Sequence, residues 1–148
     1  MSDNYDSKER KQSCPKQFIN EWFLRHVMDQ KSDKINLLLL DSGDLNTSRL
    51  AIDTLGERLD HVIVANPVPK TLSKIHQTLT QLTKQQKSKI MLSDLYLNDY
   101  LTDTKLGLLL NGVWFDYNGT FASTNKNRTG GTAPIHDIEL LAKSHRLC

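Results

Sequence analysis

Four groups of acidic, amide and hydroxyl side chains each follow a short apolar run in this sequence. The groups are Asp41, Ser42, Gly43, Asp44 and Asn46; then Asn66; then Asp94 with Leu95; and finally Asp116 to Thr120. Carboxylates and amides bind ligand hydroxyl and amino groups by hydrogen bonds, and a carboxylate can also take a proton from a reacting group. These side chains can act together only if the elements before them end at one edge of the fold.

The apolar runs are typical of strands in a parallel sheet. Residues 35–40 are almost continuously apolar, as in a strand that is covered on both faces. The runs at 61–65, 90–92 and 113–117 are shorter but similar. Helical spacing of apolar residues separates them, so we predict an α/β fold: an open, mostly parallel, Rossmann-like sheet of about four strands with helices on both faces. The carboxyl ends of such strands share one edge, where ligands bind beside the reversal of strand order.

The helices between the strands carry recognisable end signals. Asn46 is expected to cap a helix over 46–55, and Gly56 suits the left-handed position beyond its end. Leu72, Ile75, Leu79 and Leu82 predict a helix that ends near Lys84 and Lys87, where cations are favoured. Residues 95–101 fit either a short helix or a loop, and 134–145 predict a last amphipathic helix.

Apolar residues also indicate the structure of two further segments. From residue 15 onward, Phe18, Ile19, Trp22, Phe23 and Val27 form a helical stripe that we expect to cover the sheet. Residues 106–112 fit a β-hairpin with an Asn-Gly turn or the end of a crossover helix with Gly112 beyond its cap. The alternation of strands and helices favours the helix.

Length and composition limit the range of functions. The 148 residues predict one domain, residues 14–148, after a polar, disordered tail at 1–13. The net charge of +2 gives no general case for nucleic-acid or membrane binding. We expect no membrane-spanning segment, because no apolar run reaches the roughly 20 residues that span a bilayer, and the polar N-terminus is not expected to act as a signal peptide. Cys14 and Cys148 lack metal or redox spacing and are expected to be free thiols in the cytoplasm, and no metal site is predicted.

Four short segments resemble, in order and placement, the motifs of class I S-adenosylmethionine-dependent methyltransferases. They are LLLLDSGDLNTSRLA at 37–51, VIVANP at 62–67, MLSDLYL at 91–97 and VWFDYNG at 113–119. The resemblance implies S-adenosyl-L-methionine as cofactor and an unidentified methyl acceptor. Compared with the family, the first turn has only Gly43 as glycine, Asn66 replaces the ribose-binding carboxylate, and no strands are expected after the fourth.

The resemblance also implies a role for each polar group. The turn formed by Asp41, Ser42, Gly43, Asp44 and Asn46 would pass under the methionine end of the cofactor. Asn66 would meet the ribose, and Asp94 with Leu95 would meet the adenine. Asp116 would position or deprotonate the acceptor.

Other interpretations stay open at this point. Asp41, Asp44 and Asp94 also suit simple capping, and Asn66 before proline is a common turn opener. A non-catalytic methyltransferase-like module would pair its open sheet edge with another copy or a partner. In addition, WFDYNGTF resembles the nucleophile motif of haloacid-dehalogenase-type phosphatases, with Asp116 as nucleophile, although that motif normally opens the domain and its second acid is here Asn118.

Overall fold

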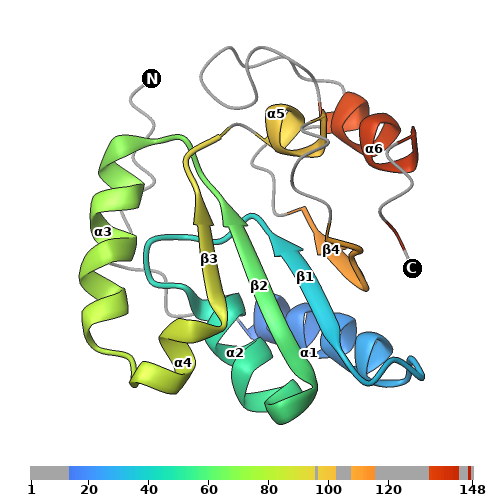
Figure 1. The fold of residues 1–148 in the computed structure, drawn as a ribbon, viewed down its shortest axis with the longest axis horizontal. Coiled ribbons are helices and arrows are strands. Elements are labelled where there is room, and N and C mark those ends of the chain that lie inside the picture. Colours follow the sequence, from blue (N-terminus) through green and yellow to red (C-terminus); the bar gives the residue numbers. More distant parts are fainter. Residues whose placement is uncertain (1–13, 96, 103–107, 116–133, 144–146, 148) are drawn as a thin grey trace.

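A computed structural model describes residues 14–95, 97–102, 108–115, 134–143 and 147. Its centre is a four-stranded, entirely parallel sheet in the order β3-β2-β1-β4 (Figure 1). The strands are β1 (Ile35–Leu39), β2 (Leu59–Ala65), β3 (Ile90–Ser93) and β4 (Gly112–Trp114). The predicted open, parallel α/β sheet is therefore confirmed, whereas the predicted tail at 1–13 lies outside the described residues.

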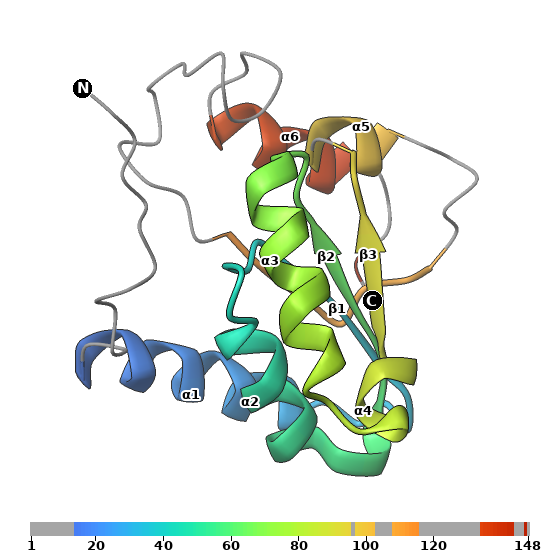
Figure 2. The ribbon, with the colours of Figure 1, turned by 90° about the vertical axis from the view of Figure 1, so that its left-hand side faces the viewer.

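Helices cover both faces of this sheet (Figures 1 and 2). On one face lie α1 (Cys14–Met28), α2 (Asn46–Leu55) and α3 (Pro69–Thr80), and on the other α5 (Leu97–Thr102) and α6 (Pro134–Lys143). The 3₁₀ turn η1 (Gly56–Arg58) and the short helix α4 (Lys84–Ser88) connect to β2 and β3. A hydrophobic core lies on each face of the sheet. Leu37 and Leu39 of β1 belong to the core beneath α1, α2 and α3, and Leu38 belongs to the core beneath α5 and α6. A continuous apolar run results because side chains on alternate faces are all buried.

The predicted inward stripe of α1 is wrong in part. Leu24 and Val27 are buried against the sheet, and Phe23 packs beside them. In contrast, the exposed fractions of Phe18, Ile19 and Trp22 are 67%, 46% and 53%. Successive residues of a helix point about 100° apart, so a stripe that contains both Trp22 and Phe23 is wider than the face that packs. The helix turns its Phe23 and Val27 side toward β4.

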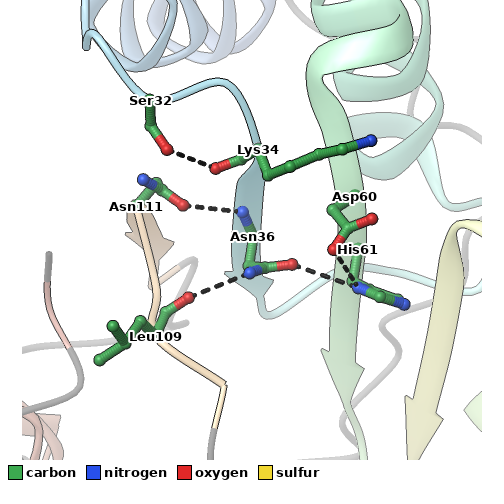
Figure 3. A network of polar contacts seen from close by, with 7 residues as sticks. All are labelled: Ser32, Lys34, Asn36, Asp60, His61, Leu109 and Asn111. Atoms are coloured by element: carbon green, nitrogen blue, oxygen red, sulfur yellow. Dashed lines mark hydrogen bonds and ion pairs between the residues drawn. The ribbon is translucent and has the colours of Figure 1, made fainter.

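Residues 108–112 follow neither of the predicted alternatives. Asn111 N donates to the Asn36 carbonyl oxygen at 2.8 Å, and Asn36 N donates to Asn111 Oδ1 at 2.9 Å (Figure 3). Asn111 therefore extends the pairing of β4 with β1. Because this pairing is parallel, a hairpin is excluded, and residues 108–111 are not helical. A Cβ atom on Gly112 would lie 3.0 Å from side-chain atoms of Leu37, Phe23 and Val27, so the glycine permits close packing of α1 on the sheet.

The other elements differ from the predictions mainly in their ends. The single helix predicted up to Lys87 is in fact two helices, because α3 ends at Thr80 and α4 starts at Lys84. Thr83 Oγ1 accepts from Gln86 N and Gln86 Oε1 accepts from Thr83 N, which is a capping box. Lys84 thus lies in a first turn, not near a helix C-terminus. Residues 97–102 are helical, which settles the helix-or-loop alternative for that segment, and the fourth strand is shorter than the predicted 113–117.

We expect Gly112→Ala to lower the free energy of unfolding by about 1–3 kcal/mol, because an added methyl group overpacks the contact between α1 and β4. Urea unfolding measures this loss. Removing the Val27 γ-methyl groups by Val27→Ala makes room for the new Cβ. The double variant should therefore lose less stability than the sum of the two single losses. Strict additivity of the two losses would contradict close packing at Gly112.

Candidate functional site

Three of the four predicted polar groups lie at one edge of the sheet. Asp41, Asn66 and Asp94 follow the carboxyl ends of β1, β2 and β3, which are parallel neighbours. Asn66 N donates to the Ser93 carbonyl oxygen at 2.9 Å, which brings the ends of β2 and β3 together. The strand order reverses at β1, between β2 and β4, and this is where open α/β sheets bind ligands. Asp116, in either of its predicted roles, lies outside the described residues.

Asp41 is a buried carboxylate that holds the first turn of α2. Its Oδ2 accepts from Ser48 N at 2.7 Å and from Ser48 Oγ at 2.8 Å. Its Oδ1 accepts from Ser42 N at 2.9 Å and from Thr47 N at 3.5 Å. A carboxylate at this position also interacts favourably with the positive end of the helix dipole. Asp41 therefore satisfies N–H groups that would otherwise be available to a ligand phosphate.

The expected cap at Asn46 is wrong. Asn46 is the first residue of α2, the N-cap residue is Leu45, and Leu45 contributes no side-chain hydrogen bond. Asp41 provides the cap from five residues upstream of the helix. Local capping patterns place the polar residue at the N-cap itself, so they could not predict this arrangement.

Burial dominates the electrostatics of Asp41. Loss of water raises the pKa of this carboxyl above its ordinary value, while the hydrogen bonds from Ser48, Ser42 and Thr47 oppose the shift. The carboxyl group is thus part of the interior rather than of an open site.

The turn after β1 is packed against α3. Thr78 Oγ1 donates to the Gly43 carbonyl oxygen at 2.6 Å, and Lys74 Nζ forms an ion pair with Asp44 Oδ1 at 2.9 Å. A Cβ on Gly43 would lie 2.6 Å from Lys74 Cδ, so the glycine leaves space for the lysine stem. Ser42, Asp44 and Asn46 are each partly exposed.

Leu45 takes the left-handed backbone conformation, with φ of 53° and ψ of 38°. A glycine adopts this conformation without strain, but a leucine pays roughly 1–2 kcal/mol. The leucine side chain is fully buried in the core, which offsets the cost. The turn therefore has a left-handed position although its only glycine is Gly43.

The accessible polar groups of the edge belong to β2 and β3. Asn66 is partly exposed, and its Oδ1 accepts from Val68 N at 3.0 Å, as in a turn opener. Asp94 is exposed and makes no ion pair with any described residue. The next residue, Leu95, is partly buried, and its N–H donates to Ser93 Oγ at 3.3 Å. An amide and a carboxylate with exposed surface therefore follow neighbouring strand ends, and the carboxylate is followed by Leu95, which packs against the core on the α5 and α6 side.

Two buried polar atoms near this edge were missed by the sequence analysis. Asn20 of α1 donates from Nδ2 to Thr47 Oγ1 at 3.3 Å, but its Oδ1 has no hydrogen-bond partner among the described residues. Trp114 Nε1 also has no hydrogen-bond partner among the described residues, and its ring lies tilted against that of Phe23, with centroids 5.0 Å apart. Asn20 lies on the buried face of α1. The sequence could have indicated its burial only through the position of the apolar stripe, and that stripe was predicted partly on the wrong side of the helix.

Other parts of the described structure contain fewer features of a ligand-binding site. A hollow lined by Ile52, Gly56, Glu57, Gln85, Gln86 and Lys89 lies between the end of α2 and α4, away from the carboxyl edge. The described residues contain no group of three or more metal-ligating side chains. Within the same part of the chain, no helix is long and apolar enough to cross a membrane.

Comparisons of the chain with protein families, with curated proteins and with solved structures find no match.

The strain at Leu45 can be tested by two substitutions at the same position. Both Leu45→Ala and Leu45→Gly lose a buried side chain, which costs about 2–5 kcal/mol. The glycine also relieves the left-handed strain, so we expect Leu45→Gly to be more stable than Leu45→Ala by about 1 kcal/mol in urea unfolding. Leu38, buried in β1, is the control, and there the alanine variant should be the more stable one. Equal losses for both variants at position 45 would contradict the strained turn.

The raised pKa of Asp41 predicts a definite pH dependence. The folded chain binds a proton at this carboxyl at pH values where the unfolded chain has released it. Its contribution to the free energy of unfolding should therefore fall as the pH rises from the ordinary value of 3.8 through the folded-state pKa. The quantity to measure is the difference in unfolding free energy between the wild type and Asp41→Asn across this interval. A difference that increases with pH would show that the hydrogen bonds affect the pKa of Asp41 more than burial does. The control is Asp53→Asn, at an exposed position of α2.

Proposed function

We propose that this protein binds S-adenosyl-L-methionine at the carboxyl edge of its sheet and transfers the methyl group to an acceptor that is not yet identified. The observation that supports the proposal is the parallel order β3-β2-β1-β4, which puts the turn after β1 beside the ends of β2 and β3. Asn66 and Asp94 then lie on neighbouring strand ends, and both side chains have exposed surface.

The residues fit the adenosine half of the cofactor well. The Asn66 amide can donate or accept a hydrogen bond with a ribose hydroxyl, and the Asp94 carboxylate can accept one from the adenine amino group. Leu95 supplies an apolar surface for the base. These contacts need no phosphate-binding N–H groups, which agrees with the use of the α2 N-terminus by Asp41.

The turn of residues 41–46 would hold the methionine half. Asp41 acts here as a positioning residue, because both of its oxygens accept hydrogen bonds within the chain. Ser42, Asp44 and Asn46 are the members of the turn with exposed surface.

Methyl transfer needs few catalytic side chains. The bound cofactor supplies an electrophilic methyl group on its sulfonium, so the protein has to align the acceptor and exclude water. A base for the acceptor proton remains a prediction at Asp116, outside the described residues. We place the activity in the cytoplasm, since Cys14 and Cys148 are read as unpaired thiols.

The packing of the turn favours a second candidate, a non-catalytic module. The aliphatic part of the Lys74 side chain lies over Gly43, and Thr78 Oγ1 donates to the Gly43 carbonyl oxygen. Helix α3 therefore covers one side of the turn that would hold the methionine half of the cofactor. In this alternative the chain pairs with a second copy through an edge strand, for example β3, where the exposed fraction of Met91 is 38%.

Calorimetric titration with S-adenosylhomocysteine tests the proposal without a known acceptor. We expect micromolar binding, and Asp94→Asn should weaken it by about tenfold, because a hydrogen bond to a charged group contributes about 1.5 kcal/mol or more. Asp53→Asn, at an exposed position in α2, is the matched control and should bind like the wild type. Asp41 is unsuitable as a probe since its removal disturbs α2.

Absence of binding at millimolar ligand would refute the cofactor proposal. Self-association in the ultracentrifuge, together with that absence, would support the module instead. Equal affinity of Asp94→Asn and the wild type would show that the ligand binds elsewhere.

A further inference from the structure

The positive charge of the chain is concentrated in one segment. Residues 61–93 contain five of the 19 lysine and arginine residues and none of the 17 acidic residues. This segment therefore carries a formal charge of +5, whereas the rest of the chain carries −3, with histidines taken as neutral. The small overall charge of +2 hides this separation.

Four of the five lysines of this segment lie on two consecutive helices. The segment contains most of β2, then α3 and α4, and then β3, and α3 and α4 follow each other along the flank of the molecule (Figure 2). Ile75 and Thr78 are buried toward the sheet, and Leu72 and Leu79 are partly buried. The opposite sides of the two helices carry exposed cationic, hydroxyl, imidazole and amide groups. We call this exposed side the basic face; it includes Lys70, Ser73, His76, Gln77, Lys84 and Lys87.

Three lysines of the basic face have no internal role in the described structure. Lys74 and Lys89 are engaged, since Lys74 pairs with Asp44 and Lys89 Nζ donates to the Gly56 carbonyl oxygen at 2.6 Å. Lys70, Lys84 and Lys87, in contrast, make no ion pair with a described residue. Two acids contact these helices: Asp44 pairs with Lys74 of α3, and Glu57 accepts a hydrogen bond from Gln85 of α4 at 3.3 Å.

Screening makes this local charge relevant to binding. Exposed charges are largely screened beyond about 10 Å at 0.1 M salt, so acids on other sides of the molecule do not cancel the field at the basic face. The α3 helix of 12 residues alone is about 18 Å long. That length corresponds to roughly five nucleotides of one strand in a duplex, at about 3.4 Å each.

The chemistry of the exposed side chains identifies the kind of partner. Phosphate oxygens are commonly contacted by lysine, serine and glutamine side chains, and all three residue types occur on the basic face. A helix that lies on a membrane also needs large apolar side chains on the contacting side. Among the exposed residues of α3 and α4 the apolar side chains are limited to Pro69, and Val68, just before α3, is exposed as well. We propose that the basic face binds the sugar–phosphate backbone of a nucleic acid.

This inference does not depend on the proposed methyl transfer. Fluorescence anisotropy with labelled single-stranded RNA and with duplex DNA of equal length tests it over a series of salt concentrations. Three phosphate contacts predict that log K falls with log salt with a slope of about −2 for the single strand and about −3 for the duplex. Comparison of the titrations with single-stranded RNA and with duplex DNA shows which nucleic acid binds more tightly.

The decisive variant is Lys70→Glu/Lys84→Glu/Lys87→Glu. We expect it to lose at least about tenfold in affinity at low salt while S-adenosylhomocysteine binding stays unchanged. The matched control, Arg25→Glu/Lys31→Glu/Lys143→Glu, changes the net charge equally at exposed positions on α1, the following loop and α6, and should lose much less. Equal losses in both variants would overturn the proposal, because binding would then depend on net charge alone.

A milder variant avoids any question of folding. Lys84→Gln/Lys87→Gln keeps the Thr83–Gln86 capping box and should make the single-strand salt slope shallower by about 1.4. An unchanged slope would exclude these lysines as phosphate contacts. Failure of the wild type to bind either nucleic acid at low salt would also overturn the proposal. If the wild type instead bound vesicles containing phosphatidylserine, the partner would be an anionic membrane.

Discussion

The buried carboxylate of Asp41 is the constraint on which the rest of this structure depends. A charge in the interior is tolerated only when hydrogen bonds replace the lost water, and here four donors from Ser42, Thr47 and Ser48 do so. Those donors can converge only if the chain turns sharply after β1 and α2 starts directly behind it. The left-handed backbone at Leu45 is what makes the turn close enough.

Contacts from the other two helices on this face meet at the same place. Asn20 of α1 binds Thr47 in the first turn of α2, and Thr78 of α3 binds the Gly43 carbonyl. The turn after β1 is therefore held from both sides. The exposed polar groups after β2 and β3 are Asn66 and Asp94, and the proposed function assigns ligand recognition to them. Since α3 begins three residues after Asn66, the basic face starts at this same edge.

The parts of the fold that could be predicted from sequence are those determined by local pattern. Apolar runs at 35–40, 61–65 and 90–92 became strands because both faces of the sheet are covered. Gly56 ends α2 with φ of 53°, as its position beyond the helix suggested. The start of α4 was also visible in principle, because Thr83 and Gln86 have capping-box spacing.

The parts that could not be predicted depend on contacts between distant segments. Gly112 looked like a turn or cap residue, but it is needed because Phe23 and Val27 pack against it. Asp41 looked like a ligand-binding acid, yet its oxygens are used by residues up to seven positions later. For the candidate site, sequence reasoning identified the strand ends and their shared edge, whereas the division between buried and accessible side chains required the structure.

Ligand binding at the carboxyl edge is tested most directly by mapping amide chemical shifts by NMR while S-adenosylhomocysteine is added. We expect the shift changes to concentrate at residues 42–46, at Asn66 and at Asp94 and Leu95, and the amides of α4 to be unaffected. Shifts confined to other parts of the molecule, or none at millimolar ligand, would contradict binding at the carboxyl edge.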